Sequence, residues 1–173
     1  MKLIYKIIGA IITVFAASFI GENKSREYKE RVKYLENIQL CTSLLENEIR
    51  YTQTPIGEAI EKIKNNAQGV IENILSYVCT EIKKHTDRSI HKIWNEAVDI
   101  NMSGVNKNDI ELLKSFGNHL GESDVEGQIK NINVFNSRIS YYLKVATDES
   151  EKNCKLYRSL GMYSGLLIAV LFF

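Results

Sequence analysis

Both ends of this 173-residue chain are apolar, and nearly all of its charge lies between them. Residues 3–20 and 160–173 contain a single charged side chain, Lys6. The first segment has 18 residues, which as an α-helix span roughly 27 Å and so match the hydrocarbon core of a bilayer, about 30 Å thick. The second reaches only about 21 Å, so we expect its helix to begin earlier, with Arg158 extending its charge to the headgroups or with local thinning of the bilayer. The sequence therefore predicts transmembrane helices at 3–20 and 156–173.

Cationic side chains crowd the inner flank of each apolar segment. Because positively charged flanks stay in the cytoplasm during membrane insertion, this pattern predicts that both termini lie outside the cytoplasm and that the middle of the chain lies inside it. The cations are Lys24, Arg26, Lys29, Arg31 and Lys33 after the first segment, and Lys144, Lys152, Lys155 and Arg158 before the second.

The first segment also has the layout of a signal peptide, and this alternative stays open. Lys2 and Lys6 would form its charged region, and Ala16, Ala17 and Ser18 would provide a tolerable cleavage site. In that case the protein is exported, and its mature N-terminus lies near Phe19.

The second apolar segment carries small residues at a four-residue spacing: Gly161, Gly165 and Ala169. This spacing puts them on one face of a helix, where another helix backbone can approach closely. We expect this face to pack on the first span or on a membrane helix of a partner. The alternative is that these residues only reflect the abundance of glycine in membrane helices.

The middle of the chain has helical periodicity throughout. Its apolar side chains recur three or four positions apart, no segment sustains the alternation of a β-strand, and the chain has one proline, Pro55. We predict an all-α fold, in which residues 22–155 form a cytoplasmic domain of about six helices. The first and last of these are long and able to lie antiparallel as a coiled stem.

Local signals place two corners within this domain. Thr54 followed by Pro55 predicts a helix start, with the threonine as N-cap and the proline at the first helical position. Gly121 is expected to terminate a helix. Ser123 and Glu126 then form a capping box that opens the last long helix.

The sequence lacks the patterns that accompany catalysis. The histidines at positions 85, 91 and 119 form no HExxH motif, and none stands at zinc-site spacing from a cysteine. His119, Glu122 and Asp124 straddle a helix end, so we interpret His119 as a solvated loop residue and not as a metal ligand. No glycine-rich phosphate-binding loop occurs, and glutamates interleave with the cations after the first segment, which disfavours nucleic acid. We predict no catalytic residue, cofactor, metal, nucleic acid or small-molecule substrate.

The three cysteines are odd in number and widely spaced along the chain. A secreted disulfide framework uses an even and dense set. We therefore expect Cys41, Cys79 and Cys154 to be reduced thiols.

Four stretches of the chain resemble the stage III sporulation protein AB family. Together they make a fairly specific signature, because two internal motifs occur in a fixed order between two terminal spans. The stretches are KLIYKIIGAIITVFAASFIGE at the start, EIRYTQTPIGEAI at 48–60, FGNHLGESDVEGQIKNI at 116–132 and YRSLGMYSGLLIAVLFF at 157–173. Between about residues 63 and 114 the match is in helical pattern only.

The resemblance implies a fold and a role beyond what the residues show. The family has a helical domain related to the cytoplasmic domains of the type II secretion inner-membrane platform protein. Its members belong to an assembly in the mother-cell membrane around the forespore, a secretion-like channel complex. The expected partners are a cytoplasmic secretion-type ATPase, other membrane subunits of the channel, and membrane lipid.

The two internal motifs supply the candidate partner contacts. Their alternative explanation is structural, because caps, turn glycines and packing aromatics also make helix corners. Charged residues rarely bury unpaired, so we expect Glu58 and Asp124 to be the exposed members. A helical scaffold or signalling protein on a membrane stalk, unrelated to secretion, is the alternative function. The candidate contacts are Tyr51, Thr54, Pro55, Glu58, Phe116, Gly117, Leu120, Gly121 and Asp124.

Overall fold

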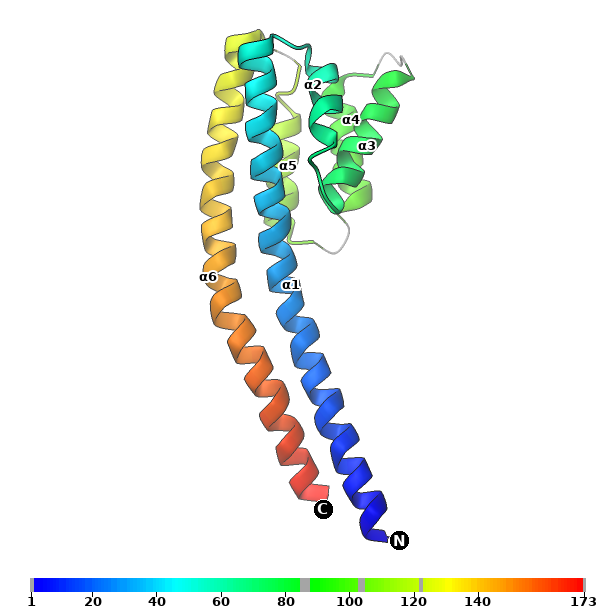
Figure 1. The fold of residues 1–173 in the computed structure, drawn as a ribbon. Coiled ribbons are helices and arrows are strands. Elements are labelled where there is room, and N and C mark those ends of the chain that lie inside the picture. Colours follow the sequence, from blue (N-terminus) through cyan, green and yellow to red (C-terminus); the bar gives the residue numbers. More distant parts are fainter. Residues whose placement is uncertain (1, 85–87, 103–104, 122, 173) are drawn as a thin grey trace. The chain divides into compact units, whose positions relative to one another are not determined.

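The computed structural model describes residues 2–84, 88–102, 105–121 and 123–172, which form six α-helices with no β-strand among them (Figure 1). The predicted all-α class is thereby confirmed for this part of the chain. His85 and Glu122 lie outside the described residues. The helices are α1 (Lys2–Thr52), α2 (Ile56–Lys64), α3 (Val70–Lys83), α4 (Ile90–Asn101), α5 (Lys107–Gly117) and α6 (Val125–Phe172).

Helix α1 runs without a break through the first apolar segment and the amphipathic stretch after it. An 18-residue window within it has a mean hydropathy of 1.4 and is 6% buried. By length and composition α1 is thus able to cross a membrane, and it is the one helix of the described residues that meets this measure. The second span, at 156–173, stays a prediction. The residues before Phe173 continue α6 without interruption.

The chain divides into two compact units, which we describe separately. The terminal unit comprises residues 1–33 and 144–173, and the central unit comprises residues 34–143. The central unit contains α2 to α5 together with the end of α1 and the beginning of α6.

The core of the central unit consists of the apolar positions that periodicity predicts. Burying a large aliphatic or aromatic side chain contributes about 1.5–3 kcal/mol, so these residues dominate its stability. An aromatic cluster lies at its centre. The ring centroids of Trp94 and Phe116 are 5.4 Å apart, and the ring centroids of Phe116 and Phe135 are 4.4 Å apart. Buried side chains from α1 are Leu35, Ile38, Cys41, Leu45 and Ile49; those from α2 and α3 include Ile60, Ile63, Ile71, Ile74, Leu75 and Val78.

One carboxylate is buried in this core. Asp109, on the first turn of α5, is 1% exposed and accepts a hydrogen bond from the hydroxyl of Tyr34 on α1. A buried charge without a partner would be costly. The pair therefore ties the start of α5 to α1 within the central unit.

The terminal unit is a pair of antiparallel helices, with both chain ends at the same end of the pair (Figure 1). Gly161 and Gly165 of α6 are buried, and Cβ atoms on them would lie 2.8 Å from the Ala17 carbonyl oxygen and 2.9 Å from the Val14 Cα, respectively. Ala169 is half-buried. The glycines at this spacing thus pack on α1 of the same chain.

Ion pairs join the same two helices beyond the apolar segments. The Arg158 guanidinium donates two hydrogen bonds to the Glu22 carboxylate, at 2.6 and 2.8 Å. Arg31 donates to Glu149 at 2.6 Å. Tyr28 stacks on Tyr157 with ring centroids 5.9 Å apart. These two ion pairs lie at different positions along the helices, and together they favour this register of the antiparallel pair.

Candidate partner-binding surface

The first corner is the connection between α1 and α2. Glu48 on α1 is its anchor, because its carboxylate accepts hydrogen bonds from Lys62 at 2.7 Å and from Thr52 and Thr54 at 3.1 Å. These contacts hold the pKa of Glu48 below its ordinary value, with the Lys62 ammonium as the largest cause. The backbone N–H of Thr54 also donates to the Glu48 carbonyl oxygen at 3.2 Å. The chain is therefore pinned where it leaves α1.

The helix start in this corner differs from the prediction by one residue. Pro55, not Thr54, is the N-cap of α2, and its carbonyl oxygen accepts the first helical hydrogen bond from Ala59. The hydroxyl of Thr54 accepts from Lys62 at 3.2 Å and donates to Glu48, and among the described residues it accepts no backbone N–H of α2. Tyr51, Pro55 and Glu58 are exposed, Tyr51 at 78%.

The second corner is the connection between α5 and α6. Helix α5 ends at Gly117, before the predicted end at Gly121, and a turn occupies residues 118–121. Gly121 adopts a φ of +79°, a left-handed conformation that favours glycine. Asp124 is the cap of α6, since its Oδ1 accepts the N–H of Gly127 at 3.0 Å. The predicted capping box at Ser123 is thus one position too early.

The buried side chain of Gln128 stabilises this turn by hydrogen bonds. This residue was not identified from the sequence. Its side chain is 6% exposed and donates to the His119 carbonyl oxygen and the Ser123 hydroxyl, both at 3.0 Å. The available signal was its place beside Ile129 and four residues before Ile132, which puts a polar side chain on an apolar face. Buried amides find partners, and here the partners are the turn.

Three of the predicted contact residues are buried in the central unit. Phe116 is 5% exposed and Leu120 is 3% exposed. Gly117 is buried against Trp94, whose indole N–H donates to the Leu113 carbonyl oxygen at 2.9 Å. A Cβ on Gly117 would overlap the indole ring. These residues pack the second corner onto the core.

The structure brings the two corners together at one end of the central unit (Figure 1). A Cβ on Gly121 would lie 3.7 Å from Ile56 at the start of α2, and 3.4 Å from Ile90 at the start of α4. Two motifs some 60 positions apart in the sequence thus form one surface. We name the exposed members the corner surface: Tyr51, Pro55, Glu58, Gly121 and Asp124.

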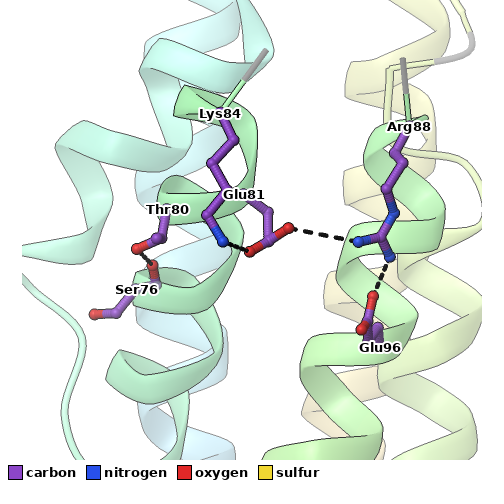
Figure 2. Close-up of polar contacts among 6 residues, drawn as sticks. All are labelled: Ser76, Thr80, Glu81, Lys84, Arg88 and Glu96. Carbon is purple, nitrogen blue, oxygen red and sulfur yellow. Dashed lines mark hydrogen bonds and ion pairs between the residues drawn. The ribbon is translucent and has the colours of Figure 1, made fainter. Parts of the chain in front are cut away.

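A polar network on α3 and α4 stabilises the same unit (Figure 2). Arg88, just before α4, donates to Glu81 on α3 at 3.4 Å and to Glu96 on α4. Lys84 also donates to Glu81, at 2.5 Å. Arg88 and the hydroxyl of Tyr77 lower the pKa of Glu96. Through Arg88, the network joins α3 to α4 on their solvent-exposed side. The sequence did not predict this network.

The described residues contain no group of three His, Cys, Asp or Glu side chains that could hold a metal ion. His119 is exposed, as expected for a loop histidine. Cys41, Cys79 and Cys154 are free thiols, and all three are buried.

Known proteins resemble this chain over most of its length. The sequence profile of the family described as Stage III sporulation protein AB matches residues 6–173. The chain is 27% identical over 173 residues to the Stage III sporulation protein AB of Bacillus subtilis (strain 168), and the match covers 96% of this chain and 98% of that protein. A solved structure of Stage III sporulation protein AB (SpoIIIAB) has a similar fold, with a TM-score of 0.63 at 23% identity; the match covers 70% of this chain and 96% of that one.

The internal motifs, the helical architecture and the extent of these matches agree. Because the family profile covers nearly the whole chain, this protein belongs to the stage III sporulation protein AB family and is a sporulation protein.

Proposed function

We propose that this protein is a membrane-held platform subunit of a secretion-like channel complex between mother cell and forespore, and that its corner surface docks a cytoplasmic secretion-type ATPase. It acts by binding and not by catalysis. The two apolar segments anchor it in the mother-cell membrane around the forespore, with the central unit in the cytoplasm and both termini outside.

The observation that carries this proposal is the meeting of the two corners. The four-stretch resemblance includes two internal motifs. Most of their apolar members pack in the core, and most of the others are exposed near the same end of the central unit (Figure 1). Glu58 and Asp124 are exposed there and neither fills the core, although Asp124 also caps α6. Tyr51 adds a large amphipathic side chain, of the kind that is enriched in interfaces.

The anchoring part of the proposal is supported by the length and hydropathy of α1. The glycine contacts between α1 and α6 also fit two helices that lie together in lipid, where small residues permit close approach. A polar unit held at the membrane in this way is placed to receive a cytosolic partner.

Charge reversal on the corner surface tests the docking. We would measure binding of the purified sporulation ATPase to the full chain in nanodiscs by biolayer interferometry, for the unaltered protein, Glu58→Lys and Asp124→Lys. Circular dichroism checks that Asp124→Lys, which loses the α6 cap, is folded. We expect at least tenfold weaker binding for each variant, about 1.4 kcal/mol, because like charges placed against a partner destabilise the complex.

Glu72→Lys and Glu111→Lys are the matched controls, since both alter exposed carboxylates of the central unit away from the corners. They should bind as the unaltered chain does. If the unaltered chain fails to bind, the partner is wrong. If all four variants lose binding equally, the surface is wrong.

A further inference from the structure

A groove of about 630 Å³ runs between the two helices of the terminal unit. Its volume is within the range of small-molecule sites, about 300–1,000 Å³. The groove is open along one side, and one of its halves is apolar while the other is polar. Ile20, Leu160 and Ile168 line the apolar half, and Asn23, Lys24, Glu27 and Tyr157 line the polar half. The small residues Ala17, Gly21, Gly161 and Ser164 complete the lining.

The change in polarity follows the chain. On α1 the lining passes from Ile20 to Asn23 and Lys24, where the first apolar segment ends. On α6 it passes from Ile168 and Leu160 back to Tyr157, where the second segment begins. On both helices the lining therefore changes from apolar to polar at the same level. This is expected of a groove that extends from the hydrocarbon core of a bilayer to its headgroups.

The floor of the groove leaves no flat face for a third helix. Gly21 and Gly161 are already in contact, because a Cβ on Gly161 would lie 3.2 Å from the Cα of Gly21. Beside the small Ala17 and Ser164, two large side chains stand at the sides of this floor: Ile20 is 69% exposed and Leu160 is 54% exposed. Small residues favour the close approach of a helix backbone, whereas the exposed Ile20 and Leu160 side chains stand in the way of one here. A narrow, flexible apolar chain fits such a slot better.

The polar end offers donors for an anionic group. The Lys24 ammonium donates to Glu27 at 2.5 Å, and an ammonium has three donors, so others are left for a second acceptor. The hydrogen bond from Lys24 to Glu27 raises the pKa of Lys24, and the Glu27 carboxylate itself lines the groove. The amide of Asn23 stands beside it in the lining. Charged donors of this kind hydrogen-bond phosphate oxygens strongly.

We propose that this groove binds a phospholipid of the surrounding bilayer, with one acyl chain along Ile20, Leu160 and Ile168 and its phosphate at Lys24 and Asn23. The inference rests on the membrane anchoring proposed above and adds to it a bound lipid, held in one orientation between the two helices.

Photolabelling tests where the lipid lies. The full chain is placed in nanodiscs of phosphatidylcholine and phosphatidylglycerol in equal parts, with a trace of phosphatidylglycerol that carries a diazirine on one acyl chain, and labelled peptides are mapped by mass spectrometry. We expect labelling at Ile20, Leu160 and Ile168 several-fold above that at Phe15 and Leu167, which are exposed but lie outside the groove.

Filling the groove should remove this excess. Ser164 lines the groove and Tyr163 is exposed without lining it, so Ser164→Trp should reduce the groove labelling to the level of Phe15, while Tyr163→Trp should not. Circular dichroism checks that both variants are folded.

Retention of the headgroup is tested by native mass spectrometry with phosphatidylglycerol and with diacylglycerol, which lacks the phosphate. The unaltered chain should retain phosphatidylglycerol in preference, and Lys24→Gln should abolish the preference. Lys155→Gln removes an exposed cation outside the groove, and this variant should keep the preference for phosphatidylglycerol.

Three outcomes would overturn the proposal. Uniform labelling of all exposed apolar residues would mean ordinary annular lipid only. Efficient disulfide formation between chains through Ser164→Cys, with loss of groove labelling, would mean that a partner's helix occupies the groove. Failure of the chain to enter nanodiscs would refute the anchoring itself, and the groove proposal with it, and is distinguishable from the first two.

Discussion

Gly117 shows how one residue decides the packing of a corner. The indole of Trp94 lies against the Cα of Gly117 and leaves no space for a side chain. The indole cannot retreat easily, because its N–H is bonded to the Leu113 carbonyl oxygen and its ring packs on Phe116. A glycine at the end of α5 is therefore required by tertiary contact and not by backbone conformation.

This contact makes Gly117→Ala destabilising. We expect a loss of about 1–3 kcal/mol in the free energy of unfolding, the usual cost of overpacking a core, measured by urea denaturation. Gly57→Ala is the matched control: its Cβ would meet Ile82 at 3.6 Å, an ordinary contact, and alanine favours the helix by up to about 1 kcal/mol. Equal stability of Gly117→Ala and the unaltered chain would show that Trp94 moves freely.

Sequence reasoning found the residues of this corner without finding their contacts. Phe116 and Leu120 were predictable as apolar positions of a helix, and Gly121 as a turn residue. The pairing of Gly117 with Trp94 was not predictable, because it joins helices that are separate in the sequence. Gln128 was missed for a related reason: its partners are backbone and hydroxyl oxygens of a turn whose shape had to be known first.

At the scale of elements, the junction of α1 and α2 depends on one carboxylate. Glu48 gathers Lys62, Thr52 and Thr54, and its folded-state pKa is lowered from an ordinary value of 4.5. A lowered pKa of an acid means that its stabilising contribution is present above the unfolded value and is lost as pH falls through the folded value. The junction should therefore loosen in acid.

We expect the unaltered chain to be more stable than Glu48→Gln at neutral pH, with the difference closing as pH falls below about 4.5. Thermal unfolding across this pH range measures it. Glu36→Gln, which removes an exposed carboxylate of the same helix, is the control for the loss of one charge. A difference that persists unchanged into acid would contradict the assignment to the ionised Glu48.

Helix existence was predictable from periodicity, whereas helix ends were not. Both corner caps lie one residue later than expected, at Pro55 and Asp124. In each case the nearer hydroxyl accepts from another side chain, Thr54 from Lys62 and Ser123 from Gln128. Helix ends are decided by such competition among nearby polar groups, which spacing rules do not capture.

At the scale of the whole molecule, the organising element in our proposal is the bilayer. The distribution of charge along the chain predicts where the lipid lies, and the family match shows a sporulation protein. The meeting of the two corners required the fold, because nothing in the sequence relates Ile56 to Gly121. The surface on which the proposed function depends is thus a property of the folded central unit alone.

The orientation is testable with one exposed thiol. The natural cysteines are poor reporters, since Cys41 is 3% exposed and burial raises its pKa to about 11, while Cys79 and Cys154 are also buried. A protonated, inaccessible thiol reacts slowly. Glu58→Cys instead places a thiol on the corner surface.

In intact, non-sporulating cells that express Glu58→Cys, a membrane-impermeant maleimide should leave the protein unlabelled, and permeabilised cells should label fully. A cysteine added before Met1 is the positive control and should react in intact cells. Loss of that added residue from the mature protein would instead reveal signal-peptide cleavage. Labelling of Glu58→Cys in intact cells would place the central unit outside, where no cytosolic ATPase could reach the corner surface.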